Sequence, residues 1–270
     1  REKTKIEVRI EAGVQVSAPL SQPAEPTLED RRGLQQEPRD NPVMYQTWRN
    51  LLFLHWEWDP EEIQRRLPPG LFVDRFGTRA YLGVTPFFMS DIRASFLPKI
   101  PGASDFLELN VRTYVHDRSG QPGVWFFSLD CNHALAVALA KVFYSLPYHG
   151  AEMEARETAG LVEYRCRRNG ERESALFHYH REDKSVIAQP GSLAFFLTER
   201  YLLFAYSKRS QKLFRARVYH QPWQLFQARV GRFDETMLRV NDFDPKLRPP
   251  NQSWFAEPVR VKIYALEETA

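Results

Sequence analysis

The stretch from Trp48 to Asp74, WRNLLFLHWEWDPEEIQRRLPPGLFVD, constrains the fold more than any other part of the chain. Its apolar run from Leu51 to Trp58 is too aromatic for a surface strand and predicts a buried one. Asp59 and Pro60 then provide an N-cap and a first-turn proline, which predict a short helix. A Pro-Pro-Gly run ends that helix, and a second strand follows.

The composition favours a β-rich globular domain. Aromatic residues make up 13% of the 270 residues, and 19 prolines supply many turn positions. The net charge of +3 comes from interspersed charges with no basic stripe, so nucleic acid is not an expected partner. No apolar run reaches the roughly 18 residues that a membrane span needs, so a membrane is not an expected partner either.

The two cysteines, Cys131 and Cys166, are too few for a disulfide framework and form no CxxC motif. Each is interpreted as a buried thiol, and a reducing, cytoplasmic location is therefore expected. The many strands and aromatic residues are compatible with a homo-oligomer, although no motif specifies one.

The chain is expected to consist of an N-terminal arm over 1–41 and one domain over 42–270. Lys5 to Ile10 alternates polar and apolar residues and is compatible with one edge strand. Residues 17–40 are rich in Pro, Gln, Glu and Arg, which predicts a linker or a poorly ordered arm.

Antiparallel strand signals dominate the domain. The clearest is a hairpin closed by Asn169-Gly170. The predicted hairpins pair 107–116 with 122–130, 161–168 with 174–181, and 201–207 with 212–220. Further strands are expected at 49–58, 71–75, 79–88, 225–230 and 258–266, and helices at 60–66, 132–145 and 192–199. Many antiparallel strands with few helices indicate an α+β fold.

Several segments together resemble a known family. Arg49 precedes a strand, Asp59 caps a helix that ends in Pro, and a Leu-hydrophobe-hydrophobe-Asp sequence follows, as in the opening of acetoacetate decarboxylase. The segments ELNVRTYV at 108–115, WFFSLD at 125–130 and FLTERY at 196–201 are similar to the YqjF-like family. That family belongs to the acetoacetate-decarboxylase-like superfamily and has no established activity.

The resemblance extends from Pro42 onward and implies a large, mostly antiparallel sheet closed into a cone-like barrel, with helices packed outside a central cavity. It also implies that Arg49, at the mouth of this cavity, binds the carboxylate of a substrate, which a planar guanidinium grips with two hydrogen bonds. His55, in the aromatic run that follows Arg49, is also expected to bind the substrate. The alternative for Arg49 is a structural salt bridge.

Glu108, Asn110, Arg112 and Tyr114 alternate along one predicted strand and therefore share one face. This face is either exposed to solvent or lines a polar cavity. In a cavity, Asn110 and Arg112 would bind substrate, and Glu108 would act as a catalytic acid or base.

The lysine that forms a Schiff base in acetoacetate decarboxylase has no counterpart at the matching place. There the family enzyme has a Pro-Lys-Lys run, whereas this chain has Leu-Pro followed by Tyr148 and His149. Lys141 lies nearby but has no adjacent cation to lower the pKa of its amine. Imine chemistry is therefore not expected, and Tyr148 and His149 are candidates for acid–base catalysis.

Other motifs carry weaker signals. His178 and His180 have a spacing compatible with a metal, but such a pair on a strand is more often solvated, so no metal and no cofactor are expected. Glu199 and Arg200 end a helix and are interpreted as mainly structural, with one of them able to reach inward.

The leading functional hypothesis is a domain with an enclosed, aromatic-lined cavity that binds a small organic acid or carbonyl compound. Turnover, if present, would be of lyase or hydratase type without a Schiff-base lysine. The alternatives are a non-catalytic binding module and a structural module whose interior is filled by its own aromatic side chains.

Overall fold

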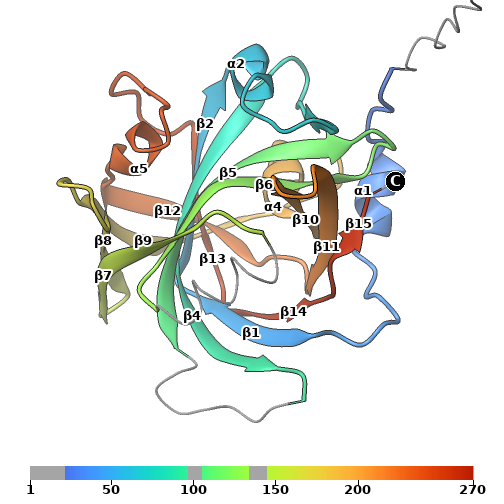
Figure 1. Cartoon of the computed structure of the whole chain (residues 1–270). Coiled ribbons are helices and arrows are strands. Elements are labelled where there is room, and N and C mark those ends of the chain that lie inside the picture. The colour runs from blue at the N-terminus through green and yellow to red at the C-terminus, as the bar shows by residue number, and fades with distance from the viewer. Residues whose placement is uncertain (1–21, 97–104, 134–144, 270) are drawn as a thin grey trace, which may run out of the picture.

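The computed structural model describes residues 22–96, 105–133 and 145–269, and it is built mostly from β-strands with a few short helices (Figure 1). The helices are α1 (Leu28–Gly33), α2 (Pro60–Gln64), α4 (Leu193–Thr198) and α5 (Thr236–Arg239). The strands are β1 (Met44–Arg49), β2 (Leu51–Trp58), β3 (Leu71–Val73), β4 (Ala80–Ala94), β5 (Phe106–Asp117), β6 (Pro122–Cys131), β7 (Tyr148–Thr158), β8 (Leu161–Arg168), β9 (Ala175–Val186), β10 (Leu202–Ser207), β11 (Lys212–His220), β12 (Leu225–Arg232), β13 (Gln252–Ala256), β14 (Val259–Ile263) and β15 (Glu267–Glu268). The expected edge strand at 5–10 and nearly all of the expected helix at 132–145 lie outside the described residues.

The strands form one continuous sheet in the order β1-β14-β11-β10-β6-β7-β8-β9-β12-β13-β2-β4-β5-β3. The pairs β6–β7 and β6–β10 are parallel, and the other pairs between described strands are antiparallel. Two further pairings, β1 with β4 and β5 with β6, join strands that are distant in this order. They complete a circuit of paired strands through β1, β14, β11, β10, β6, β5 and β4. The mostly antiparallel sheet with few helices agrees with the predicted α+β class, and the cone-like barrel stays a prediction.

All three predicted hairpins are present, as β5–β6, β8–β9 and β10–β11. The turn between β8 and β9 holds Gly170 at a φ of 92°, a conformation that favours a residue without a Cβ atom. Strands β7, β13 and β15 and nearly all of β1 were not expected from the sequence. Both cysteines are buried and free, as predicted.

Asn50 divides the segment that was expected to be one strand at 49–58. Its φ of 51° lies in the left-handed region, which Asn tolerates better than most residues. The chain therefore leaves β1 and enters β2 through a sharp change of direction, and side-chain alternation does not continue from Arg49 to Leu51. The following helix α2 begins as predicted, because the side chain of Asp59 accepts a hydrogen bond of 2.9 Å from the backbone N–H of Glu61.

Strands β4 and β5 separate two apolar interiors. On one side of β5, Leu109 and Val111 pack into a cluster that includes Trp56 and Tyr164. On the other side is a second apolar cluster, which contains Phe53 and buried apolar side chains from several strands of this circuit. Because β-strand side chains alternate, the polar face of β5 must point into this second interior.

Residues 24–37 pack against the domain instead of forming a loose arm. Thr27 and Asp30 form a reciprocal capping box that starts α1. The guanidinium of Arg217 donates hydrogen bonds of 2.7 and 2.8 Å to the carbonyl oxygens of Leu34 and Gln36. The expectation of a poorly ordered arm therefore does not hold for this part, because its polar residues bind groups of the domain that lie far away in sequence.

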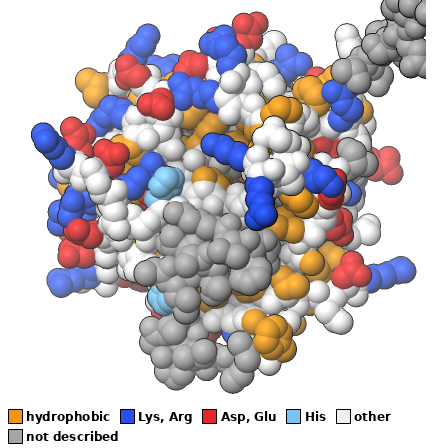
Figure 2. Space-filling view, viewed as in Figure 1, with side chains coloured by type: hydrophobic (Ala, Val, Ile, Leu, Met, Phe, Trp, Pro, Cys, Tyr) orange, Lys and Arg blue, Asp and Glu red, His pale blue; other side chains and the backbone are white. Residues whose placement is uncertain are grey.

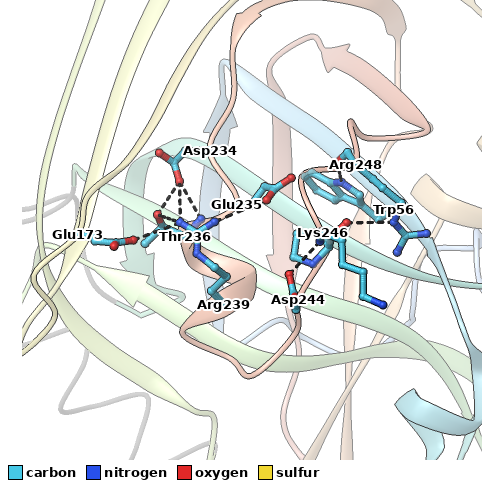
Figure 3. Close-up of polar contacts among 10 residues, drawn as sticks. Trp56, Glu173, Asp234, Glu235, Thr236, Arg239, Asp244, Lys246 and Arg248 are labelled. Carbon is cyan, nitrogen blue, oxygen red and sulfur yellow. Dashed lines mark hydrogen bonds and ion pairs between the residues drawn. The ribbon is translucent and has the colours of Figure 1, made fainter.

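The loop around α5 is fixed by its own polar contacts (Figure 3). Arg239 forms ion pairs with Glu173 at 3.2 Å and with Glu235 at 3.6 Å. The indole N–H of Trp56 donates a hydrogen bond of 2.9 Å to the carbonyl oxygen of Arg248. These contacts tie the loop to the strand β2 and to the turn between β8 and β9.

Positive and negative side chains lie mixed around the face shown in Figure 2. This mixture agrees with the small net charge and gives no continuous basic surface on that face. Across the described ranges, no helix is long and apolar enough to cross a membrane.

Candidate active site

A cavity of about 560 Å³ lies inside the strand circuit. Its walls are mostly apolar and aromatic, and they come from the strands β1, β2, β4, β5, β6, β7, β10, β11 and β14 and from the end of α4. The aromatic wall residues include Trp48, Phe53, Phe87, Phe106 and Phe126. Among the described residues, aromatic side chains line this interior and leave a cavity of this volume, which argues against the purely structural hypothesis.

The polar face of β5 lines the cavity. Glu108, Asn110 and Arg112 all contribute to its wall, while Leu109 and Val111 pack on the opposite side of the sheet. The structure thus places this face in the cavity and not in solvent, and it brings three sequence-predicted site residues together.

Glu108 and Tyr148 form the clearest acid–base pair. The Tyr148 hydroxyl donates a hydrogen bond of 2.7 Å to Oε2 of Glu108, whose side chain is buried. Burial raises the pKa of Glu108 to about 7, although the hydrogen bonds from Tyr148 and Asn110 oppose the rise. A carboxyl group with a pKa near neutrality can both accept and donate a proton under physiological conditions.

The raised pKa of Glu108 predicts a pH-dependent stability. The folded-state pKa of about 7 lies above the ordinary value of 4.5, so this group favours folding fully below pH 4.5 and loses that contribution as the pH rises through 7. The loss corresponds to about 3 kcal/mol at ~1.4 kcal/mol per pKa unit. Glu108→Gln should remove this decline, as measured by urea unfolding at a series of pH values.

Two buried histidines also make the stability depend on pH, so the unfolding of Glu108→Gln must be compared with that of the wild-type protein. Burial lowers the pKa of His220 to about 4, and burial together with Arg112 lowers the pKa of His55 well below its ordinary value. Their contribution to stability is therefore lost as the pH falls below about 6.5, opposite in sign to that of Glu108. The difference between the two unfolding curves isolates Glu108, and equal curves would contradict the prediction.

Arg112 is the most unusual cation of the site. Among the described residues it has no carboxylate partner, and its buried Nε atom has no hydrogen-bond acceptor. Its guanidinium carbon lies 4.9 Å from the ring centroid of Phe53. A Cβ atom on the neighbouring Gly83 would lie 3.2 Å from Cγ of Arg112, so the glycine leaves room for the arginine stem.

Arg200 is a second cavity arginine that sequence reasoning interpreted as mainly structural. Its Nε donates a hydrogen bond of 2.6 Å to the carbonyl oxygen of Phe196, and its Nη1 bonds Oδ2 of Asp74 at 2.7 Å. Its buried Nη2 has no acceptor within the described structure. Burial lowers the pKa of Arg200 to about 10, and Asp74 opposes that shift. The helix end in FLTERY was the available signal, but nothing in the sequence indicated the contact with Asp74.

Several polar atoms without hydrogen-bond partners belong to the part of the cavity wall that includes Arg112 and Arg200. Besides Arg112 Nε and Arg200 Nη2, the buried Oγ1 of Thr85 and Oδ1 of Asn110 lack hydrogen-bond partners in the described structure. All four side chains line the cavity. Buried polar atoms are normally satisfied, so this set indicates a place for a polar group of a ligand.

His55 lies beneath the cavity wall rather than in it. Its Nε2 is 2.6 Å from the hydroxyl oxygen of Tyr114, and its ring stacks on Phe53 with 6.0 Å between centroids. The side chain is fully buried and is not among the cavity-lining residues. Its contacts support the Phe53 and Tyr114 rings, and its role in binding a substrate stays a prediction.

Arg49 is not among the residues that line the cavity, and its role in binding a substrate carboxylate stays a prediction. The exposed side chain donates a hydrogen bond of 3.3 Å to the hydroxyl of Ser90 and lies over the ring of Phe88. A strand continuing through position 50 would have placed Arg49 on the face of Leu51 and Phe53, which do line the cavity. The left-handed Asn50 breaks that alternation.

His149 is likewise not among the residues that line the cavity. It follows Tyr148 on β7, so its side chain points to the opposite face from that of Tyr148. Tyr148 therefore reaches Glu108, whereas His149 does not share that surface.

No described lysine lines the cavity, and Lys141 lies outside the described residues. Within the ranges that the structure covers, no group of three or more His, Cys, Asp or Glu side chains is arranged to hold a metal ion. His220 lines the cavity, and its Nδ1 is 2.8 Å from the carbonyl oxygen of Gln221.

A comparison with protein families matches residues 45–260 to DUF2071, described as an uncharacterised conserved protein. A curated relative, the uncharacterised protein YqjF of Bacillus subtilis (strain 168), is 39% identical over 188 residues, which cover 69% of this chain and 76% of that protein.

Solved structures support the fold assignment. The acetoacetate decarboxylase of Legionella pneumophila has a TM-score of 0.59 at 11% identity, with 94% of this chain and 98% of that chain covered. The enduracididine biosynthesis enzyme MppR, in complex with pyruvate, has a TM-score of 0.58 at 13% identity, with 86% and 93% covered. At these identities the likeness establishes an acetoacetate-decarboxylase-like fold and nothing about the reaction.

Proposed function

Because this chain belongs to the DUF2071 family of uncharacterised conserved proteins and has an acetoacetate-decarboxylase-like fold, we propose that its cavity binds a small organic acid that carries a carbonyl group. The observation that carries this proposal is Arg112, a cation in an apolar cavity without a carboxylate partner among the described residues. A ligand carboxylate would supply the missing negative charge. MppR, which shares the fold, has been solved with pyruvate bound.

The second arginine strengthens this assignment. Arg200 shares Asp74 with Arg31, so two guanidinium groups face one carboxylate and a net positive charge remains. In a cavity with low dielectric, an unneutralised charge of this kind attracts an anion much more strongly than it would in water. Arg112 and Arg200 would hold the carboxylate, and Thr85 and Asn110 would bind the neighbouring polar group.

Glu108 and Tyr148 would then act on the bound acid. A carboxylate beside a carbonyl compound can remove a proton from the carbon next to the carbonyl group, which is the step that enolase-type and lyase-type reactions share. The circuit of strands would keep this chemistry in a cone-like barrel away from water. No described lysine is available for an imine, so the proposed chemistry proceeds through proton transfer.

The test of binding compares two arginines. Arg112→Met should lower the affinity for keto acids at least tenfold, because its charge lies inside the cavity, whereas Arg49→Met should leave it unchanged. Thermal shift followed by isothermal titration with pyruvate, acetoacetate and α-ketobutyrate provides the readout. Arg49→Met also serves as a control for loss of an arginine. Equal affinity in wild type and Arg112→Met would remove the proposal, and a loss in Arg49→Met alone would restore the assignment made from sequence.

A further inference from the structure

The cavity is long as well as wide. Phe106 and Arg112 stand six positions apart on β5, and both line the cavity wall. At a rise of about 3.3 Å per residue, the wall between them extends roughly 20 Å along the strand. A keto acid of three or four carbons would occupy only the part beside the arginines.

The polarity of the wall changes along this length. In the register of β4 and β5, Thr85 lies opposite Asn110, next to Arg112, whereas Met89 lies opposite Phe106. Beyond Met89, Ala94 lies opposite Met44 of β1, and both line the cavity. The cavity therefore has a charged end and an apolar end.

Polar groups near the apolar end are already occupied. The Gln46 amide accepts a hydrogen bond of 2.8 Å from the indole N–H of Trp48, and its Nε2 lies 3.1 Å from the sulfur of Met44. The unpaired polar atoms of the cavity lie instead at the opposite end, at Arg112 and Arg200. Among the described residues, a ligand would thus find unpaired hydrogen-bonding atoms at one end and a mostly apolar surface at the other, where the His133 ring lies 5.4 Å from that of Phe106.

We infer that the ligand is a keto acid with an extended apolar tail, with its carboxylate at Arg112 and Arg200 and its tail along the inner face of the paired strands β1 and β4 toward Ala94. This inference rests on the proposed function and narrows its substrate class. The cavity volume of about 560 Å³ lies within the range of roughly 300–1,000 Å³ that sites for drug-sized ligands occupy. Burial of each further methylene group against this wall strengthens binding by the hydrophobic effect.

The experiment measures dissociation constants for α-ketobutyrate, α-ketocaproate and α-ketocaprylate by isothermal titration. Each added methylene should tighten binding about two- to fourfold until the apolar end is filled. The uncharged 2-oxooctanamide, which keeps the keto group, should bind at least tenfold more weakly than α-ketocaprylate, since it lacks the carboxylate. Ala94→Phe should weaken binding of α-ketocaprylate and leave that of α-ketobutyrate unchanged. Ser95→Phe, which adds the same ring at the exposed neighbouring position, is the matched control.

The outcomes separate the two proposals. Equal affinities for the short and long keto acids, or an Ala94→Phe variant that binds the long acid as wild type does, would overturn the apolar-tail inference alone. Tight binding of 2-oxooctanamide would overturn the carboxylate site and support the apolar tail. No binding of any acid would overturn both.

Discussion

Glu108→Gln is expected to lower the rate of deuterium exchange at the carbon next to the carbonyl of a bound keto acid by about 10²- to 10⁴-fold, the usual contribution of a general base. In the proposed step the ligand's C–H bond breaks, the proton moves to an oxygen of Glu108, and the electron pair moves onto the carbonyl oxygen as an enolate. Glutamine retains the size of glutamate but cannot accept this proton. Proton NMR in deuterated buffer measures the exchange directly.

The pH profile distinguishes a catalytic role of Glu108 from a structural one. Because the ionised carboxylate is the base, exchange should increase as the pH rises through about 7 and then level off. Tyr148→Phe removes a hydrogen bond that lowers the pKa of Glu108, so it should move the midpoint to higher pH. A structural tyrosine would change the rate without this movement.

Glu154→Gln is the matched control for this experiment. Glu154 lies on β7 with Tyr148, but its side chain is exposed. The Glu154→Gln variant should catalyse deuterium exchange of the keto acid at the wild-type rate. If Glu108→Gln also exchanges at the wild-type rate, Glu108 is not the base. If keto acids bind to the wild-type protein without any exchange, the non-catalytic binding module becomes the better description.

Local patterns in the sequence predicted much of the fold. The hairpins depend on alternation and on turns such as Asn169-Gly170, which act over a few residues. The same alternation placed Glu108, Asn110 and Arg112 on one face. The sequence left open whether that face is exposed, because the answer depends on strands that pair from distant parts of the chain.

The positions that the sequence did not indicate have equally physical origins. A single left-handed residue, Asn50, turns Arg49 away from the cavity, and Asn in that position gives only a weak signal. Arg200 reaches the cavity wall because it bonds Asp74, which is 126 residues away. No periodicity in either segment could have indicated that contact.

Asp74→Asn is expected to destabilise the protein by about 3–5 kcal/mol, since it leaves two largely buried guanidinium groups without their counterion. Arg31 of α1 donates two hydrogen bonds to Asp74, at 2.6 and 2.7 Å, and Arg200 donates another at 2.7 Å. The Asp74 side chain is 1% exposed. Burial alone would raise the pKa of Asp74, but Arg200 and Arg31 outweigh burial and hold that pKa below its ordinary value.

Urea unfolding near neutral pH measures this loss, and an exposed ion pair provides the control. Glu152 pairs with Arg167 on the surface, with 68% of its side chain exposed, so Glu152→Gln should cost no more than about 1 kcal/mol. A similar small effect for Asp74→Asn would show that the cluster is not a stabilising ion network.

Arg31→Met separates stability from ligand binding in the same cluster. Without Arg31, Asp74 can neutralise Arg200 alone, so the net positive charge at the cavity should fall and keto acids should bind more weakly. Arg217→Met is the control. It removes the hydrogen bonds to the carbonyl oxygens of Leu34 and Gln36 and so loosens the same N-terminal segment. It leaves the charges around Asp74 intact. Equal loss of affinity in both variants would mean that α1 acts only by packing. A larger loss in Arg31→Met means that the N-terminal segment sets the charge of the site.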